Sequence, residues 1–434
     1  MKRKTLAMFL AGALTLGLLA GCSNKDADNS TSPSKDPGST TTDDQGGGST
    51  GEVTDITLKV WCPSNQIDTG IMAQQQEAFQ AEHPEWNITW DTTAVGEDKC
   101  QDEVLKDVEA AADVFFFAND QLPVLVNAGA IAQLGGSTAE MVNSTMAQAV
   151  IDTAMSDGKL YAIPFTHNTF FMYYDKTLLS EDDIKSVEGI MAAQTPDNAY
   201  NFYFESAGGW KLGAWYYGAG LPVFGPTGND LSAGVEWNNA TGLAVTNYLI
   251  DLIGNKKCAY DGEIAVSELI GDHRLGAWWD GAWNYGTYHD VLGDDLGLAV
   301  IPTFNFDGTD HQLLGFYGSK CIGVNAKSKN PAAAVAFAAF LGNEENQVLR
   351  YEKSAQIPTN KNAAESEAVK ADALATVLVN ESNNCSVMQP VDSTFSARYW
   401  TYAGAIPTEI RSGELNKGNA QAKLDAFVAS MTAE

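Results

Sequence analysis

Several of the ten tryptophans in this chain lie beside glycine, aspartate or asparagine rather than inside apolar runs. The segment WWDGAWNYG, residues 278–286, shows this most clearly, because the Asp280-Gly281 pair predicts a turn directly before Trp283. Turns lie at the surface, so burial in a core does not explain an indole at this position. An exposed indole is a platform for the C–H face of a sugar ring, and Asp, Asn and Gln side chains bind the hydroxyl groups around its rim. Tryptophan beside amides and carboxylates therefore predicts a carbohydrate site.

Packing in a core is the other use of tryptophan, and we expect it for several of these indoles. In LGAWWD, residues 275–280, the alternation of a strand sends Trp278 and Trp279 to opposite faces, where one or both pack against helices. Trp215 lies in a helical pattern and is expected in the core as well. Trp283, beyond the turn, fits a packing role poorly.

The sequence lacks the signatures of common enzyme classes. It contains no G-x-S-x-G, H-E-x-x-H, Walker loop, G-x-G-x-x-G or EF-hand loop, and its five histidines have no metal-ligand spacing. We therefore expect no cofactor, no metal and no catalytic residue. A secreted glycosidase remains as an alternative, and it needs two carboxylates about 5 to 9.5 Å apart. Glu205, Asp280 and Asp120 are candidates, although nothing in the sequence pairs them.

The first residues predict export and anchoring. Three basic residues at positions 2–4 precede the apolar run FLAGALTLGLLA, which is too short to span a bilayer comfortably and ends in LAGC at 19–22. This ending resembles a bacterial lipobox, which implies a signal peptide of residues 1–21 and a lipid on Cys22; a plain secretory signal with a chance cysteine is the alternative. Residues 22–52 contain hardly any apolar side chain and predict a disordered tether that spans roughly 30 Å.

Charge and cysteine content narrow the class of protein. The formal net charge of −29 argues against nucleic acid and anionic lipid as partners, because both select basic patches. Five cysteines besides Cys22 have no C-x-x-C spacing, so neither a disulfide framework nor a zinc site is predicted. Cys62 and Cys100 could pair, and the sequence leaves that open. The chain beyond residue 52 is long enough for two domains with separate cores.

Strands and helices alternate directly after the tether. The expected elements are strands at 56–61, 87–94 and 113–118 and helices at 67–84 and 99–112. This order is typical of a parallel sheet, whose ligands lie beyond the carboxyl ends of its strands. Trp61 and the Asn119-Asp120 pair lie at two such ends, which is a positional argument for function.

The remaining chain continues as a mixture of both element types. Strands are expected at 160–165, 170–175, 275–280 and 296–304, and helices near 180–193, 210–220, 236–254, 331–343, 365–379, 395–411 and 419–431. We therefore expect an α/β protein of two lobes.

Longer segments of the chain resemble a known family. They are FFFANDQLPVLVNAGAIAQL (115–134), GKLYAIPFTHNTFFMYYDKTLL (158–179), GLAVIPTF (297–304) and ARYWTYAGAIPTEIRSG (397–413), in that order. Together with the lipobox and tether, they resemble bacterial extracellular solute-binding proteins of ABC transporters, most closely the maltose/maltodextrin-binding proteins. The resemblance runs over about residues 53–434.

In the N-terminal lobe, the resemblance implies a polar ligand site. Trp61 matches an aromatic that closes the first strand, with Asn65 and Gln66 in the loop that follows, and Asp120 matches a sugar-binding aspartate next to Asn119. Gln121 stands where maltose-binding proteins have an arginine. Asn168, at the first crossover between the lobes, stands where they have a glutamate. Loss of an ionised group at each position weakens the inference to maltose, although neutral polar side chains still bind an oligosaccharide's hydroxyls.

In the C-terminal lobe, the resemblance implies the stacking surface. Trp210, Trp283 and Trp400 match three aromatics that stack along successive sugar rings, and Asp280 beside Trp283 is expected to take part. The complete expected ligand-binding set is Trp61, Asn65, Gln66, Asn119, Asp120, Gln121, Asn168, Trp210, Asp280, Trp283 and Trp400.

The implied fold is a two-lobe periplasmic-binding-protein-like fold with a ligand cleft and three interlobe crossovers. The crossovers are expected near 166–169, 316–320 and 372–394, with an N-terminal lobe of 53–167 and 319–374 and a C-terminal lobe of 168–318 and 375–434. Ligand contacts made to both lobes at once favour closure of the cleft by hinge bending.

The implied function is that of a binding protein and not of an enzyme. A monomer, lipid-anchored through Cys22 at the extracellular face of the cytoplasmic membrane, captures malto-oligosaccharides and delivers them to an ABC permease. A binding protein for a different oligosaccharide is the main alternative, and the secreted glycosidase is the other.

Overall fold

The computed structural model describes residues 53–205, 209–226, 228 and 230–433. The expected signal peptide, the lipidated Cys22 and the tether lie outside the described residues. Among the helices that are described, none has both the length and the apolar character needed to cross a membrane.

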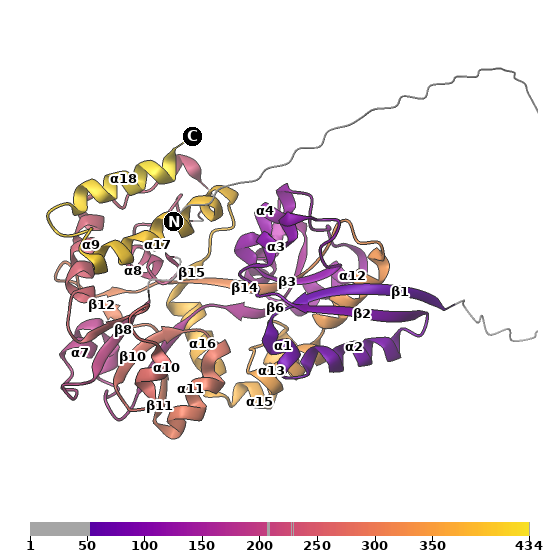
Figure 1. The fold of residues 1–434 in the computed structure, drawn as a ribbon, viewed down its shortest axis with the longest axis horizontal. Coiled ribbons are helices and arrows are strands. Elements are labelled where there is room, and N and C mark those ends of the chain that lie inside the picture. Colours follow the sequence, from indigo (N-terminus) through magenta and orange to yellow (C-terminus); the bar gives the residue numbers. More distant parts are fainter. Residues whose placement is uncertain (1–52, 206–208, 227, 229, 434) are drawn as a thin grey trace, which may run out of the picture. The chain divides into compact units, whose positions relative to one another are not determined.

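The first lobe is built on a sheet in the order β15-β14-β3-β1-β2, with β6 paired to β14 (Figure 1). β1 (Thr54–Cys62) pairs in parallel with both β2 (Trp86–Ala94) and β3 (Val114–Ala118), as the alternation of strands and helices predicted. β3 reads VFFFA and has helices on both faces, so a continuous apolar run suits it better than an alternating one. The other elements before the first crossover are α1 (Ser64–Asp68), α2 (Ile71–Glu82), α3 (Cys100–Lys106), η1 (Asn119–Gln121), α4 (Leu122–Asn127), α5 (Gly136–Thr145), α6 (Gln148–Asp152), β4 (Met155–Ser156), β5 (Lys159–Leu160) and β6 (Ala162–Asn168).

The second lobe is built on a separate sheet in the order β11-β7-β10-β8-β9. β10 (Leu275–Asp280) lies at its centre, parallel to β8 (Tyr200–Phe204) and antiparallel to β7 (Phe171–Asp175). Further elements of this part of the chain are η2 (Asp183–Lys185), α7 (Val187–Ala192), α8 (Gly213–Gly218), η4 (Leu231–Ala233), α9 (Ala240–Ile253), β9 (Cys258–Tyr260), α10 (Val266–Ile270), η5 (Ala282–Asn284), α11 (Tyr285–Leu292), η6 (Gly293–Asp295), β11 (Leu296–Ala299), β12 (Thr303–Phe304) and β13 (His311–Gln312).

β14 (Gly315–Val324) belongs to both lobes, because its pairing changes along its length (Figure 1). Gly315 to Tyr317 pair with β15 (Ser386–Met388), and the residues from Gly318 onward pair with β6, joined from Lys320 by β3. The helices that follow are α12 (Pro331–Leu341), α13 (Glu344–Ser354), α14 (Lys361–Ala364), α15 (Glu367–Lys370), α16 (Ala373–Asn384), α17 (Ser393–Ser412) and α18 (Ala420–Thr432). Val369 and Leu374 pack in a cluster with Trp278, on the second lobe's sheet.

The tryptophans expected in the core are there. Trp278 packs in the cluster with Val369, whereas Trp279 packs with Trp215 on the other face of the second sheet. The prediction that strand alternation separates Trp278 from Trp279 is therefore confirmed.

The five cysteines of the described residues are buried and free, Cys62 and Cys100 included. The pairing that the sequence left open is therefore absent from the structure.

Candidate ligand-binding cleft

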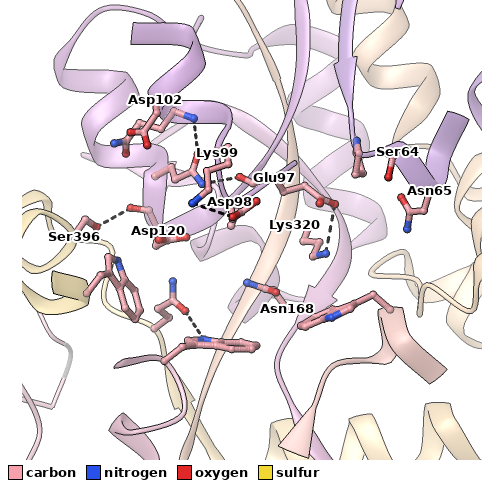
Figure 2. Close-up of a pocket in the computed structure, with 18 of the residues that line it drawn as sticks. Ser64, Asn65, Glu97, Asp98, Lys99, Asp102, Asp120, Asn168, Lys320 and Ser396 are labelled. Carbon is pink, nitrogen blue, oxygen red and sulfur yellow. Dashed lines mark hydrogen bonds and ion pairs between the residues drawn. The ribbon is translucent and has the colours of Figure 1, made fainter. Parts of the chain in front are cut away.

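A cavity of about 990 Å³ lies between the two lobes, and residues from both line it (Figure 2). Its volume falls in the upper part of the range for small-molecule sites, so a ligand of more than one ring fits it. The first lobe contributes Ser64, Asn65, Glu97, Asp98, Lys99, Gln101, Asp102, Asp120, Gln121 and Lys320, and the second contributes Trp210, Trp283, Asn284, Gln389, Ser396, Trp400 and Thr401. Asn168 lines the cavity from the end of β6, at the expected first crossover between the lobes. The charged groups of this lining all come from one lobe and its three indoles all come from the other.

Three indoles form the apolar wall. Trp210 precedes α8, and its ring stacks on that of Trp283 with 6.0 Å between the ring centroids. The indole N–H of Trp210 donates to Oε1 of Gln389 at 3.1 Å, which fixes the plane of the ring. Trp400 lies on α17 and is held edge-on by Phe395, with 5.3 Å between centroids. Each ring thus has a neighbour that fixes its orientation before a ligand arrives.

Asp120 is a carboxyl that lines the same cavity as these indoles. It lies in η1, directly after β3, and its backbone carbonyl accepts a hydrogen bond from Ser396 Oγ on α17 at 2.8 Å. Removal of the carboxyl from water raises its pKa to about 7. Asp120 can therefore change its charge near neutral pH while it faces the cavity.

Gln121 organises the loop that carries most of the cleft's charge. Its Nε2 donates to the carbonyl of Glu97 at 2.6 Å, and its Oε1 accepts from the backbone N–H of Gln101 at 2.8 Å. The two bonds hold Glu97, in the loop after β2, and Gln101, in the first turn of α3, close to the end of β3. Gln121 is 6% exposed, so most of its hydrogen-bonding capacity is used inside the protein.

Asp280 holds the turn that presents Trp283. Its carboxylate accepts hydrogen bonds from the backbone N–H of Gly281 at 2.8 Å, Nδ2 of Asn284 at 2.8 Å and the hydroxyl of Tyr288 at 2.5 Å. The turn predicted from Asp280-Gly281 is present, and η5 follows it. The six-membered ring of Trp283 lies directly over Gly281, where a Cβ atom at residue 281 would come within 2.1 Å of the ring.

Seven of the residues expected at the site line the cavity: Asn65, Asp120, Gln121, Asn168, Trp210, Trp283 and Trp400. Four do not. Trp61 packs against the core of the first lobe, and Gln66 is wholly buried between Gln356 and Arg350. Asn119 is also buried, and its side-chain oxygen accepts from the backbone N–H of Ser319 at 3.1 Å. The carboxylate of Asp280 is bonded to Gly281, Asn284 and Tyr288 within its own turn.

Sequence reasoning missed the segment from Glu97 to Asp102, together with Lys320, Gln389 and Ser396. The segment follows the end of β2, so the rule that located Trp61 and Asp120 at strand ends applies there too. Lys320 and Gln389 carry no comparable signal, because they reach the cavity only through the crossing of β14 and β15 between the lobes.

The architecture and cleft agree with a family comparison. A family model described as bacterial extracellular solute-binding protein matches residues 74–377. The chain belongs to this family. Two curated relatives of this solute-binding protein are a galactooligosaccharide-binding protein of Bacillus subtilis (strain 168), 26% identical over 62% of the chain, and a maltooligosaccharide ABC transporter solute-binding lipoprotein of Streptococcus pneumoniae (strain ATCC BAA-255 / R6), 25% identical over 63%. Each match spans 65% of the relative's own length.

A solved structure of a similar protein with acarbose supports the same conclusion. It is 37% identical, covers 87% of this chain and 99% of that chain, and superposes with a TM-score of 0.82. The expected α/β fold with two lobes is thereby confirmed, as is the resemblance to the family. Both relatives are named for oligosaccharide binding, one of them as a solute-binding lipoprotein of an ABC transporter, and the family model confirms a solute-binding protein rather than an enzyme.

Proposed function

We propose that this solute-binding protein captures oligosaccharides in its interlobe cleft, and that malto-oligosaccharides are its ligands. The observation that carries the proposal is the division of the cavity between an indole wall and a polar wall. Indoles bind the apolar faces of sugar rings, and carboxylates, amides and ammonium groups bind their hydroxyls, so a pyranose chain satisfies both walls at once. Trp210, Trp283 and Trp400 are the proposed stacking residues, and Asn65, Asp120 and Asn168 the proposed hydroxyl-binding residues.

The names of the relatives support an oligosaccharide as the ligand, but they name different oligosaccharides. The Streptococcus pneumoniae protein is named for maltooligosaccharides and the Bacillus subtilis protein for galactooligosaccharides, while the solved structure was obtained with acarbose. A galacto-oligosaccharide is therefore the second candidate ligand. Both kinds of oligosaccharide have sugar rings with C–H faces that can stack on an indole. They differ in the orientation of the ring hydroxyl groups, which the polar wall contacts.

We further propose that the protein is a lipid-anchored monomer that delivers its ligand to an ABC permease. The lipobox ending at Cys22 supports anchoring, and the family description supports an extracellular location. The lobes, proposed as 53–167 with 319–374 and 168–318 with 375–434, close on the ligand because a bound sugar adds contacts to both walls at once. The permease then binds the closed form.

A thermal-shift panel tests the choice of ligand. Malto-, galacto-, xylo-, manno- and fructo-oligosaccharides of matched length are added to the purified protein, because a ligand that binds only the folded state raises the melting temperature. The proposal expects the largest shift with the malto-series. A larger shift with galacto-oligosaccharides moves the assignment to the second candidate, and no shift with any sugar contradicts oligosaccharide binding.

A further inference from the structure

Lys320 occupies an unusual position in the cleft. It lies on β14 just beyond the point where this strand passes from the second lobe to the first, next to an irregularity in the pairing of β14 with β6. Its side chain is only 14% exposed and points into the cavity (Figure 2). A long cationic side chain so well covered must have specific partners, because an unpaired buried charge is costly.

The partners of Lys320 come from both lobes. Its Nζ lies 3.4 Å from Oε1 of Glu97, a first-lobe carboxylate whose side chain is 11% exposed. The same Nζ lies 4.6 Å from the ring centroid of Trp283, which belongs to the second lobe. An ammonium at this distance over an indole face is attracted by the ring, and more strongly when water is largely excluded.

Each partner is itself held in place. The carbonyl of Glu97 accepts hydrogen bonds from Gln121 Nε2 at 2.6 Å and from the backbone N–H of Ala118 at 3.3 Å. On the other side, the Asp280 turn fixes Trp283, whose ring lies against Gly281 and stacks with the ring of Trp210. Lys320 therefore joins two rigid parts of the cleft rather than two mobile side chains.

We propose that Lys320 is a positioning residue that latches the lobes together by holding Trp283 to Glu97 in the absence of ligand. The proposal deepens the proposed function, since it states what sets the geometry of the same cleft. The latch supplies an ionised group to a polar wall in which Gln121 and Asn168 are neutral. The latch also predicts that a large fraction of the ligand-free protein is in the closed conformation. The arriving sugar then meets a Trp283 ring whose orientation is already fixed.

The ligand-free protein gives the decisive measurement. Spin labels at Leu105→Cys on α3 and Val291→Cys on α11, both exposed positions, report the separation of the lobes without any sugar. Lys320→Met keeps the length of the side chain but removes the charge, and the latch predicts a longer and broader distance distribution. Lys320→Gln serves if Lys320→Met does not fold. An unchanged distribution contradicts the latch, whether or not the protein binds a sugar.

Two comparisons separate the latch from simpler effects. The double variant Lys320→Met/Glu97→Gln removes both charges; the latch predicts that it is as open as the single variant, whereas a return to the wild-type distance would show that a stranded carboxylate caused the opening. Lys185→Met removes one partner of the exposed Lys185–Asp182 pair and is the matched control, with no change expected.

Affinity measurements complete the test with the sugar that gives the largest thermal shift. Lys320→Met is expected to weaken binding about 3- to 30-fold, the range of a partly desolvated cation–π contact. In a Trp283→Ala background, the same change should have little further effect, because the two residues act as a pair. Tighter binding by Lys320→Met would instead show that Lys320 competes with the sugar for the ring, and would overturn the proposal. If no sugar binds the wild type, the proposed function fails while the spin-label distances still decide the latch.

Discussion

Asp120 combines a place in the cleft with a pKa of about 7, raised mainly by its removal from water. An ionised carboxylate is a stronger acceptor for a sugar hydroxyl than a protonated one, which loses acceptor capacity. At pH 6 most of the empty protein holds a neutral Asp120, and the ligand must displace a proton to gain the stronger bond. We therefore expect affinity to rise between pH 6 and pH 8 and to level off above it, with proton release on binding near pH 7.

Calorimetry in two buffers of different ionisation enthalpy measures both the affinity and the released proton. Asp120→Asn is the matched variant, because it keeps an acceptor oxygen but has no charge to lose. It should bind more weakly at pH 8 and show a nearly flat profile. A wild-type affinity that is independent of pH between 6 and 8 would remove Asp120 from direct contact with the ligand.

Trp283 is the residue for which sequence and structure can be compared most directly. The Asp-Gly pair predicted a surface turn, and the indole beyond it lines the cavity rather than a core. Trp283→Ala is expected to weaken sugar binding by roughly 1 to 3 kcal/mol, as loss of an aromatic anchor does, with circular dichroism and melting temperature nearly unchanged. Loss of folding would return the ring to a packing role.

At the scale of elements, the turn between β10 and η5 can be tested without touching any polar group. Gly281 has a φ of −87°, which any residue adopts, so Gly281→Ala is purely a steric probe. Its Cβ would lie 2.1 Å from the Trp283 ring and must push that ring away from its present position. We expect about tenfold weaker sugar binding, within the range for a displaced aromatic anchor.

Gly286→Ala, five residues further on, provides the control. It lies in α11 with no atom near the site of a new Cβ, so it should leave affinity unchanged and stabilise the helix slightly. Equal affinities for the two alanine variants would show that the position of the Trp283 ring does not matter for binding.

Two of the expected helices are shorter in the structure or divided, and in both cases an aspartate side chain binds backbone N–H groups at the break. The helix expected over 99–112 ends at Lys106 because Asp107 accepts from the N–H groups of Glu109 and Ala110 and forms a turn of its own. The helix expected over 365–379 is likewise divided into α15 and α16, where Asp372 caps the N–H of Leu374 at 2.8 Å.

α13 was missed for a related reason. Its buried face carries Asn346, Gln347 and Arg350, so the apolar periodicity that reveals a helix is absent. Arg350 is 1% exposed and is bonded by neutral groups, the carbonyl of Leu341 at 2.6 Å and Oε1 of Gln66 at 3.2 Å. Gln66 was predicted to bind the ligand, but it takes part in this buried network instead. The network joins residues far apart in the sequence, so no local pattern predicts it.

At the scale of the whole molecule, the sequence could place the parallel strands of the first lobe but not the contacts between lobes. Local order was enough to put Asp120 at a strand end, since β1 and β3 are close in the chain and adjacent in the sheet. The approach of Lys320 to Trp283, or of Ser396 to Asp120, depends on how two separately folded lobes meet. No short-range sequence pattern predicts how the lobes meet. For this reason the three indoles of the aromatic wall were all predicted, whereas several residues of the polar wall were not.

The helix that leads into β15 contains another carboxyl whose pKa is raised by burial, and this group couples the stability of the fold to pH. Glu381 on α16 is fully buried; its Oε2 accepts from the backbone N–H of Ile301 at 2.9 Å, and its Oε1 has no hydrogen-bond partner among the described residues. Burial raises its pKa from 4.5 to about 8. Between these two pH values the unfolded chain binds fewer protons than the folded one, so the free energy of unfolding falls as pH rises and levels off above pH 8.

Glu381→Gln keeps the acceptor for Ile301 and has no proton to lose, so it should remove this part of the pH dependence. We expect wild type and variant to be about equally stable at pH 5, and the variant to be more stable by about 2 to 5 kcal/mol at pH 8.5. Urea denaturation across this range measures the difference, with Glu345→Gln, exposed on α13, as the control that should follow the wild type. If the difference between Glu381→Gln and wild type stays constant from pH 5 to pH 8.5, Glu381 is already ionised within the fold at pH 5, and its burial does not raise its pKa.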